Sequence, residues 1–326
     1  MRYTLLMLAI SAFAENSYKP YKIVTQFPVG GEGGWDYVTL DAGARRLYVS
    51  HATRVEVLDA DTGKVVGAIA DTPGVHGIAI AGNYGFTTNG RENKLTVFMP
   101  STLAVVKKLD VGKGPDGIFY HAATQRIFTC NHGSHDVSVV DAVKAEVVGT
   151  VEVKGDGESM VLGKDGLLYV NVEDTAEVVA FDPKSLKVVR RMAIGVAKVP
   201  TGLAYDPKTN HLFVACREKP MLVIMDAATG KVVTTFPIGA GVDWADFDQK
   251  RRVAMTSSGG DGSMGMFVQK SGKYTDLGPF KTALGAKTFA YDAKTGRLFL
   301  PTADFVMTDG RCVITAGTFR VLVAGR

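Results

Sequence analysis

The stretch TGLAYDPKTNHLFVAC, residues 201–216, places a polar turn between two short apolar runs. Residues 202–205 alternate in the way that is typical of a β-strand with one buried face. The turn at 206–210, DPKTN, is rich in residues that favour local hydrogen bonds or a positive φ, and HLFVA then pairs back. Two further strands follow at 221–226 and 232–239, joined by the turn AATGK. The stretch therefore opens a unit of four antiparallel strands.

The same unit recurs seven times along the chain. Its equivalent first positions are Asp36, His76, Asp116, Glu158, Thr201, Asp243 and Lys287. They lie 40 to 44 residues apart, and a period of ~40–45 residues with short strands is typical of propeller blades. Helical periodicity is absent. The sequence thus predicts an all-β fold over residues 15–326, a seven-bladed β-propeller with four-stranded blades.

The two ends of the repeat fit together. The seventh unit reaches only its third strand, TFRVLVAG at 318–325. The segment YKIVTQFPVG at 21–30 precedes the first unit and resembles the fourth strand of the fifth unit, KVVTTFPIG at 231–239. We therefore expect the N-terminal strand to complete the last blade and to remove the free sheet edge there.

The repeat resembles that of the YVTN-type seven-bladed propellers of bacteria, the YncE-like group. The matching segments are LYVSH (47–51), VEVLDADTGKVVG (55–67), GSHDVSVVDA (133–142), LLYVNV (167–172) and LFVAC (212–216). The resemblance covers essentially all of the mature chain. It implies an exported propeller and no single function, because related propellers include surface-layer antigens, lactonases and the haem-d domain of nitrite reductase.

The first residues, MRYTLLMLAISAFA, have a positive start, an apolar centre and an Ala-x-Ala end. This pattern predicts a signal peptide over 1–14 and a periplasmic or secreted protein, the alternative being a buried first strand. No second apolar run is long enough for a membrane span. We expect the mature protein to be a monomer.

Charge and cysteine content narrow the classes of partner. A net charge of +4 without a basic run argues against nucleic acid. No C-x-x-C-H occurs, so covalently attached haem is excluded. The cysteines Cys130, Cys216 and Cys312 are expected to be buried free thiols, with a regulatory or intermolecular role for Cys312 as the alternative.

Antiparallel topology places the unit starts and the ends of the second strands on one face, around the mouth of the central channel. We predict that this mouth binds a small polar ligand. The candidate ligand-binding residues are Trp35, Asp36, His76, Asn89, Arg91, Asp116, Asn131, Glu158, Glu173, Arg217, Asp243, Trp244 and Lys287. The alternative is that these polar groups satisfy one another, with Lys287 paired to Asp36. His121 falls in a turn on the opposite face.

A metal site is the second interpretation of this mouth. Imidazole and carboxylate together suit zinc, copper or iron. His51, His76 and His132, with Asp36 or Asp116, could bind one divalent ion.

Two other functions stay open. A lactonase-type hydrolase could use His76, beside Asp116 or Asp36, as general base, with Arg217 steadying an oxyanion; no G-x-S-x-G motif occurs. A protein-interaction scaffold could use two longer loops on the same face, at 256–265 and 303–317.

Overall fold

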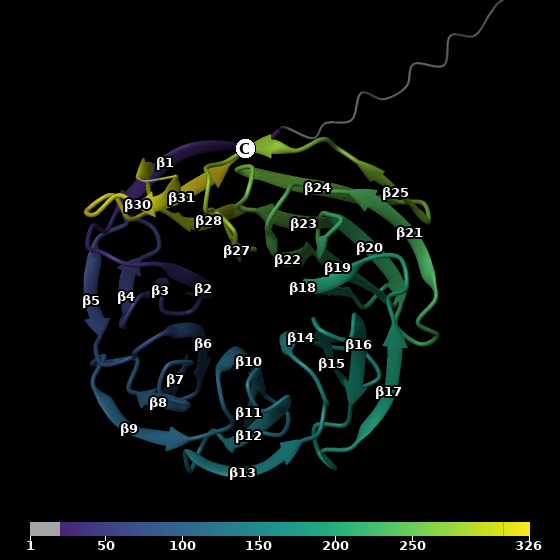
Figure 1. Ribbon diagram of the computed structural model, residues 1–326, viewed down its shortest axis with the longest axis horizontal. Helices are drawn as coiled ribbons and strands as arrows, with labels where there is room; N and C mark the ends of the chain where they lie inside the picture. Colours follow the sequence, from purple (N-terminus) through teal and green to yellow (C-terminus); the bar gives the residue numbers. More distant parts are fainter. Residues whose placement is uncertain (1–19, 309) are drawn as a thin grey trace, which may run out of the picture.

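Seven four-stranded antiparallel sheets are arranged in a ring around a central axis (Figure 1). The structure is a computed structural model, and it describes residues 20–308 and 310–326. Across these residues the fold is all-β, which confirms the predicted seven-bladed propeller. The expected signal peptide at 1–14 lies outside the described residues.

Each of the first six blades is built from consecutive strands, counted outward from the channel. Blade 1 consists of β2 (Trp35–Asp41), β3 (Arg46–His51), β4 (Arg54–Asp59) and β5 (Val65–Ile69). Blade 2 consists of β6 (Val75–Ala81), β7 (Tyr84–Asn89), β8 (Lys94–Phe98) and β9 (Val105–Asp110). Blade 3 consists of β10 (Pro115–His121), β11 (Arg126–Asn131), β12 (Asp136–Asp141) and β13 (Glu146–Val151). Blades 4 and 5 consist of β14 (Gly157–Leu162), β15 (Leu168–Val172), β16 (Glu177–Phe181) and β17 (Val188–Ala193); and β18 (Lys198–Asp206), β19 (His211–Glu218), β20 (Met221–Asp226) and β21 (Val232–Pro237). Blade 6 consists of β22 (Val242–Asp248), β23 (Val253–Ser258), β24 (Ser263–Lys270) and β25 (Lys273–Asp276), with β26 (Phe280–Lys281) also paired to β24.

The last blade joins the two ends of the chain. Its strands are β27 (Ala290–Asp292), β28 (Arg297–Thr302), β31 (Arg320–Gly325) and β1 (Lys22–Pro28), in that order. Phe27 of β1 lies opposite Val321 of β31, and its ring packs 6.2 Å from that of Phe299. The predicted closure by the N-terminal strand is therefore confirmed.

The hydrophobic core lies between neighbouring blades. Phe213 of blade 5 stacks on Phe247 of blade 6 at 4.9 Å, and Phe128 of blade 3 lies 5.6 Å from Phe181 of blade 4. Burying one such side chain contributes roughly 1.5–3 kcal/mol. Apolar residues on alternate strand positions thus hold sheet against sheet.

The innermost strands are also tied together by side-chain hydroxyls that cross from one blade to the next. Thr39 donates to the carbonyl of Ile78 at 2.8 Å, and Ser159 donates to that of Thr201 at 2.6 Å. Thr288 donates to the carbonyl of Asp36, across the closure of the ring. These hydrogen bonds fix the spacing of the blades around the channel.

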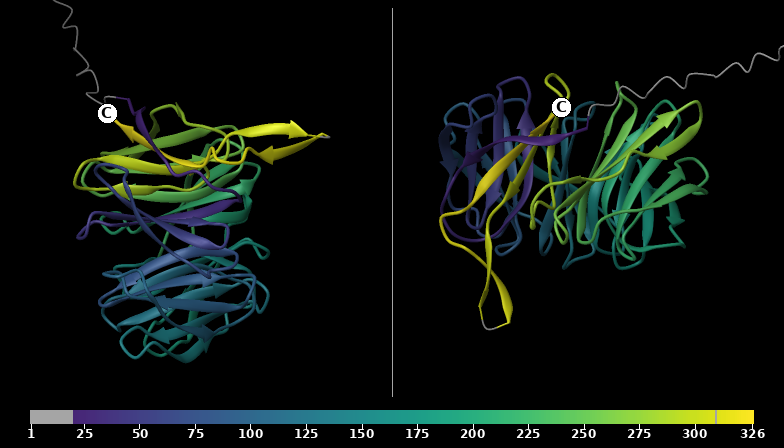
Figure 2. Two further views of the ribbon diagram at one scale, coloured as in Figure 1. Left: turned by 90° about the vertical axis from the view of Figure 1, so that its left-hand side faces the viewer. Right: turned by 90° about the horizontal axis from the view of Figure 1, so that it is seen from above.

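The two loops expected on the mouth face differ from the prediction. The prediction of a long loop at 256–265 is wrong, because β23 and β24 extend into this segment and leave only a turn at 259–262. The segment 303–317 instead holds a separate two-stranded hairpin, β29 (Phe305–Thr308) and β30 (Arg311–Ile314). This yellow hairpin projects from the propeller (Figure 2).

Cysteine burial matches the prediction at two of three positions. Cys130 and Cys216 are buried free thiols, whereas Cys312 is exposed on β30. The expectation for Cys312 was wrong because its strand belongs to the hairpin rather than to a blade. None of the described residues forms a helix that is long and apolar enough to cross a membrane.

Candidate functional site at the channel mouth

β-bulges at the start of the innermost strands direct polar side chains toward the channel. In blades 1 to 6 the pairing register shifts between the first residues of the innermost strand and its neighbour. Asp36, His76, Asp116, Glu158, Thr201 and Asp243 all lie at these shifts. A bulge breaks the strict alternation of a strand and re-aims a side chain, so acidic and basic groups can face the axis beside a buried core.

Side chains of the neighbouring strand satisfy the backbone amides that the bulges free. Ser50 accepts from the amide of Asp36 at 2.8 Å, and Thr88 accepts from that of Gly77 at 2.7 Å. Asn171 does the same for the amide of Ser159 in blade 4. The irregular backbone is thus built into the blades.

The charged side chains at the mouth form a ring of alternating sign. In order around the ring the members are Arg217, Asp243, Lys287, Asp36, His76, Asp116, His132 and Glu158. Arg217 contacts Asp243. Lys287 Nζ bridges Asp243 Oδ2 at 2.8 Å and Asp36 Oδ1 at 2.9 Å. The expected Lys287–Asp36 pair is confirmed, and most of these charges satisfy one another.

The two histidines each lie beside a carboxylate. His76 Nδ1 is 2.6 Å from Asp36 Oδ2 and 3.5 Å from Asp116 Oδ2. His132 Nε2 is 2.9 Å from Glu158 Oε2, at an angle that is not that of a hydrogen bond. The other oxygen of Asp116, Oδ1, is buried without a hydrogen-bond partner among the described residues.

Proton affinities follow from these neighbours. Burial alone would lower the pKa of His76, but its hydrogen bond to Asp36 and the charge of Asp116 raise it to about 9. Burial would also lower the pKa of His132, but the neighbouring Glu158 carboxylate outweighs burial and raises this pKa to about 10. Both imidazoles are therefore protonated at neutral pH.

The pKa values of the carboxyl groups at the mouth shift in two directions. Burial and the charge of Asp36 raise the pKa of Asp116 to about 6, and burial with the charge of Asp116 raises that of Glu158 to about 7. Although burial works against it, the charge of Lys287 and the contact with His76 lower the pKa of Asp36. Burial and the charge of Glu158 raise the pKa of Glu173 to about 7. Acidic groups are therefore crowded on the side of blades 3 and 4, where they hold their protons more tightly than free carboxyl groups do.

Two residues that the sequence did not rank stand out. Tyr37 follows Asp36 on β2 and reaches across the channel, where its hydroxyl donates to Glu158 Oε1 at 2.5 Å. Its ring meets that of Trp244 edge-on at 5.3 Å. Met160, two residues after Glu158, lines the channel below. The signal for Tyr37 was present: most other units have Gly, Ser or Thr at the equivalent position, and only Trp244 is also aromatic.

Several predicted residues do not join the ring. Asn89 and Asn131 are fully buried and bond within their own blades, to Thr96 at 2.7 Å and to Ser138 at 2.9 Å. Trp35 donates to the carbonyl of Gly285 at 3.0 Å in the joint between blades 7 and 1. Each of these positions serves the architecture of the blades.

His51 and Arg91 also lie apart from the predicted site. The His51 ring stacks on Phe319 at 4.1 Å, and its Nδ1 is 3.4 Å from Glu56. The structure therefore does not group His51 with His76 and His132. Arg91 is exposed and has no ion pair within the described part of the chain. His121 bonds Thr124 on the opposite face, as expected.

A cavity of about 320 Å³ opens beside Arg217 and Lys287 and is otherwise lined by Asp243 and glycines. A Cβ on Gly259 would lie only 2.8 Å from that of Lys287, so glycine is needed for this close approach. Asp243 contacts both cations. Its carboxylate therefore competes with any small anion that enters.

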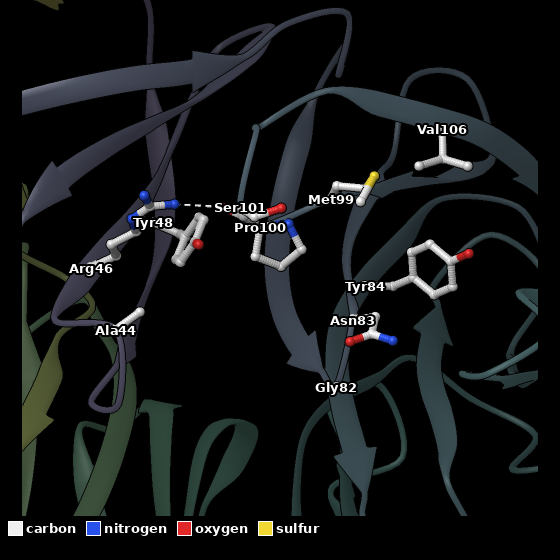
Figure 3. A pocket seen from close by; sticks show the side chains of 10 residues that line it. All are labelled: Ala44, Arg46, Tyr48, Gly82, Asn83, Tyr84, Met99, Pro100, Ser101 and Val106. Carbon is white, nitrogen blue, oxygen red and sulfur yellow. Dashed lines mark hydrogen bonds between the residues drawn. The ribbon is translucent and has the colours of Figure 1, made fainter.

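A larger cavity of about 600 Å³ lies between blades 1 and 2 on the opposite face (Figure 3). Arg46 is its charged residue, and it donates to the carbonyl of Pro100 in the next blade. Arg126 bonds the carbonyl of Pro183 in the same way at 2.9 Å. Arg46 is thus part of a recurring bond between blades, and this cavity carries no separate functional assignment.

Comparison with known proteins supports the fold alone. No family model matches the chain, and no curated protein matches it. Among 1570 matching chains of solved structures is Kuenenia stuttgartiensis hydrazine synthase. It is 15% identical with a TM-score of 0.74, and the match covers 87% of this chain and 95% of that one. The propeller fold is therefore confirmed, and at this identity the match says nothing of activity.

Proposed function

We propose that this protein is an exported propeller of the YVTN type that binds a divalent transition-metal ion at the mouth of its channel. The repeat segments that resemble YVTN-type propellers support the family. The N-terminal pattern over residues 1–14 supports export to the periplasm or the outside of the cell. The metal-binding role rests on the geometry of the ring itself.

The observation that carries the proposal is a carboxylate shared by two sets of metal-ligand atoms. Asp36, His76 and Asp116 offer three such atoms within 4.8 Å of one another, and so do Asp116, His132 and Glu158. Three protein ligands with one open position are typical of zinc sites that also bind water or a substrate. Imidazole with carboxylate suits zinc, copper, iron and nickel.

The state of Asp116 adds a physical reason for a bound cation. A buried polar atom without a partner costs roughly 1–3 kcal/mol. Asp116 Oδ1 is such an atom, and it belongs to the residue that both sets share. A cation at the mouth would satisfy this oxygen and stabilise the ionised forms of the crowded carboxyl groups around Glu158.

Protons compete with the metal for the same imidazoles. His76 and His132, with pKa values of about 9 and about 10, hold a proton at neutral pH. A metal binds only the deprotonated ring, so binding releases protons. The same protonation leaves His76 unable to accept a proton at neutral pH, which favours binding over the lactonase-type alternative.

The test is metal content together with titration. Chelator-treated protein is titrated with Zn²⁺ at pH 8 and followed by isothermal calorimetry in two buffers of different ionisation enthalpy. We expect binding with net proton release, and loss of that binding in His76→Ala. The matched control is His135→Ala, because His135 lies with Asp156 and Asp174 in an exposed group outside the ring. Unchanged binding in His76→Ala, or loss in His135→Ala, would overturn the assignment.

A further inference from the structure

The channel contains a second, mainly apolar cavity below the charged ring. It measures about 220 Å³, room for roughly seven waters at ~30 Å³ each. The lining residues are Tyr37, Val38, Thr39, Gly77, Ile78, Gly117, Ile118, Phe119, Glu158, Ser159, Met160 and Trp244. The innermost strands run away from the mouth, so the partly exposed Thr39 and Phe119 lie at the end remote from the ring.

Glu158 is the one ionisable carboxylate in this lining. Its residue is 6% exposed. Tyr37 donates to Oε1 at 2.5 Å, and His132 lies 2.9 Å from Oε2. Although Tyr37 and His132 already contact its two oxygens, Glu158 is the group in this lining that attracts positive charge, so a ligand with a cationic end fits the cavity better than an anionic one.

Aromatic side chains line the same cavity as this carboxylate. Trp244 and Tyr37 meet edge-on at 5.3 Å, and Phe119 completes the aromatic part of the lining. Aromatic faces attract ammonium groups through the ring quadrupole, most strongly when water is excluded. Gly77 and Gly117 keep the wall free of side chains, and a Cβ on Gly117 would lie 1.8 Å from the carbonyl oxygen of Glu158.

The charge balance of the mouth allows one more cation. Even with every group ionised, five carboxyl groups (Asp36, Asp116, Glu158, Glu173 and Asp243) balance four cationic side chains (His76, His132, Arg217 and Lys287), so the mouth as a whole does not repel a further cation. The acidic groups are most crowded around Glu158, which has Glu173 and Asp116 as acidic neighbours.

We propose that the cavity below Tyr37 binds a small organic ammonium ion with an apolar body, its charge directed at Glu158 and the face of Trp244. This site shares Glu158 with the second set of metal-ligand atoms, but it uses neither Asp36 nor His76 of the first set. An arylalkyl ammonium of the size of 2-phenylethylammonium fits the volume and the lining.

The experiment compares two probes of matched shape on the full, chelator-treated protein. Calorimetry at pH 7 with 2-phenylethylammonium should show binding, and 2-phenylethanol, which lacks the charge, should bind about tenfold more weakly. Trp244→Leu should weaken ammonium binding by about tenfold or more. Ile118→Trp, which fills the cavity, should abolish ammonium binding. If Ile118→Trp does not fold, the isosteric Glu158→Gln replaces it as the test variant and should also lose ammonium binding.

The control separates this site from the mouth. His76→Ala should leave the affinity for the ammonium probe within about twofold while removing the response to Zn²⁺. If the metal proposal fails, the ammonium titration should be unchanged. If the ammonium proposal fails, the Zn²⁺ titration should be unchanged. Equal binding of both probes, no binding of the ammonium, or full binding to the folded Ile118→Trp or Glu158→Gln variant would overturn the proposal.

Discussion

At the scale of single residues, the mouth is a set of charges that depend on one another. Lys287 holds Asp36 and Asp243, and each histidine lies beside a carboxylate. Part of the ring therefore stabilises the fold, and the shared carboxylate Asp116 is the member left with an unpartnered oxygen. The charged side chains of the ring therefore contribute both to the stability of the fold and to the proposed metal site.

This coupling predicts how stability depends on pH. The folded-state pKa values of His76 and His132, about 9 and about 10, exceed the unfolded value of 6.5. Their contribution is therefore fully present below pH 6.5 and is lost as the pH rises through 9 to 10. Raised pKa values at Asp116 and Glu158 act in the same direction at lower pH, because the folded state favours their protonated forms.

We expect the melting temperature of the metal-free protein to fall between pH 6.5 and 10, and His76→Gln to flatten that decline. Differential scanning fluorimetry across this range measures it, with the exposed His135→Gln as the control. A melting temperature that rises over the same range would contradict the pairing of the imidazoles with the carboxylates.

The hydroxyl of Tyr37 gives a second prediction at this scale. Tyr37→Phe removes the donor to Glu158 Oε1 and leaves the ring of the side chain in place. Hydrogen bonds to charged groups are worth ~1.5–3 kcal/mol, so the free energy of unfolding should fall by about that amount. Urea unfolding measures it. Tyr120→Phe is the control, since the Tyr120 hydroxyl has no hydrogen bond within the described chain, and an equal loss in both variants would refute the role of the bond.

At the scale of strands, the bulges and the closing strand position the site. The bulges at the start of the innermost strands in blades 1 to 4 and 6 carry the charged residues of the ring, whereas Thr201 at the bulge of blade 5 is buried. β1 completes blade 7 and so fixes β27 and β28 beside Asp36 and Lys287. The mouth has a defined geometry only if the ring is closed.

Phe27 tests the closure directly. It is 6% exposed on β1 and packs against Phe299. Phe27→Ala should lower the free energy of unfolding by about 3–5 kcal/mol, as for other buried phenylalanines. Val24 on the same strand is 47% exposed, so Val24→Ala should cost little. A small effect of Phe27→Ala would mean that β1 does not hold the ring together.

The sequence predicted these elements well and the site only in part. Units spaced by 40 to 44 residues with alternating apolar positions are enough to predict blades and the closure by the N-terminal strand. The ring members at unit starts were predicted because topology alone places them at the mouth. His51 and Asn131 sit at strand ends as predicted, but whether such a side chain faces the channel or its own blade depends on local contacts such as Phe319 and Ser138.

Tyr37 shows a second limit of sequence reasoning. Its partner Glu158 is 121 residues away in a blade across the channel. No spacing rule connects them, because the contact arises only when the ring closes. The hairpin at 305–314 is a similar case: its length was visible, whereas its pairing as a separate sheet was not.

At the scale of the whole molecule, seven similar blades create one axis at which unlike residues meet. The blades share the same pattern of apolar strand positions, so we expect the residues that differ between unit starts to determine what the channel binds. The charged mouth and the apolar cavity below it share Glu158, which accepts a hydrogen bond from Tyr37 in the cavity wall. We therefore propose two chemically different sites along one axis.

The central claim is that a divalent metal binds between Asp36, His76 and Asp116. The most direct measurement is an anomalous difference map at the zinc edge from crystals of the protein soaked in Zn²⁺. A peak ~2.0–2.2 Å from the ligand atoms of His76 and Asp116 is the predicted result. A map with no peak at the channel mouth, or with a peak only at the exposed group of His135, Asp156 and Asp174, would contradict it.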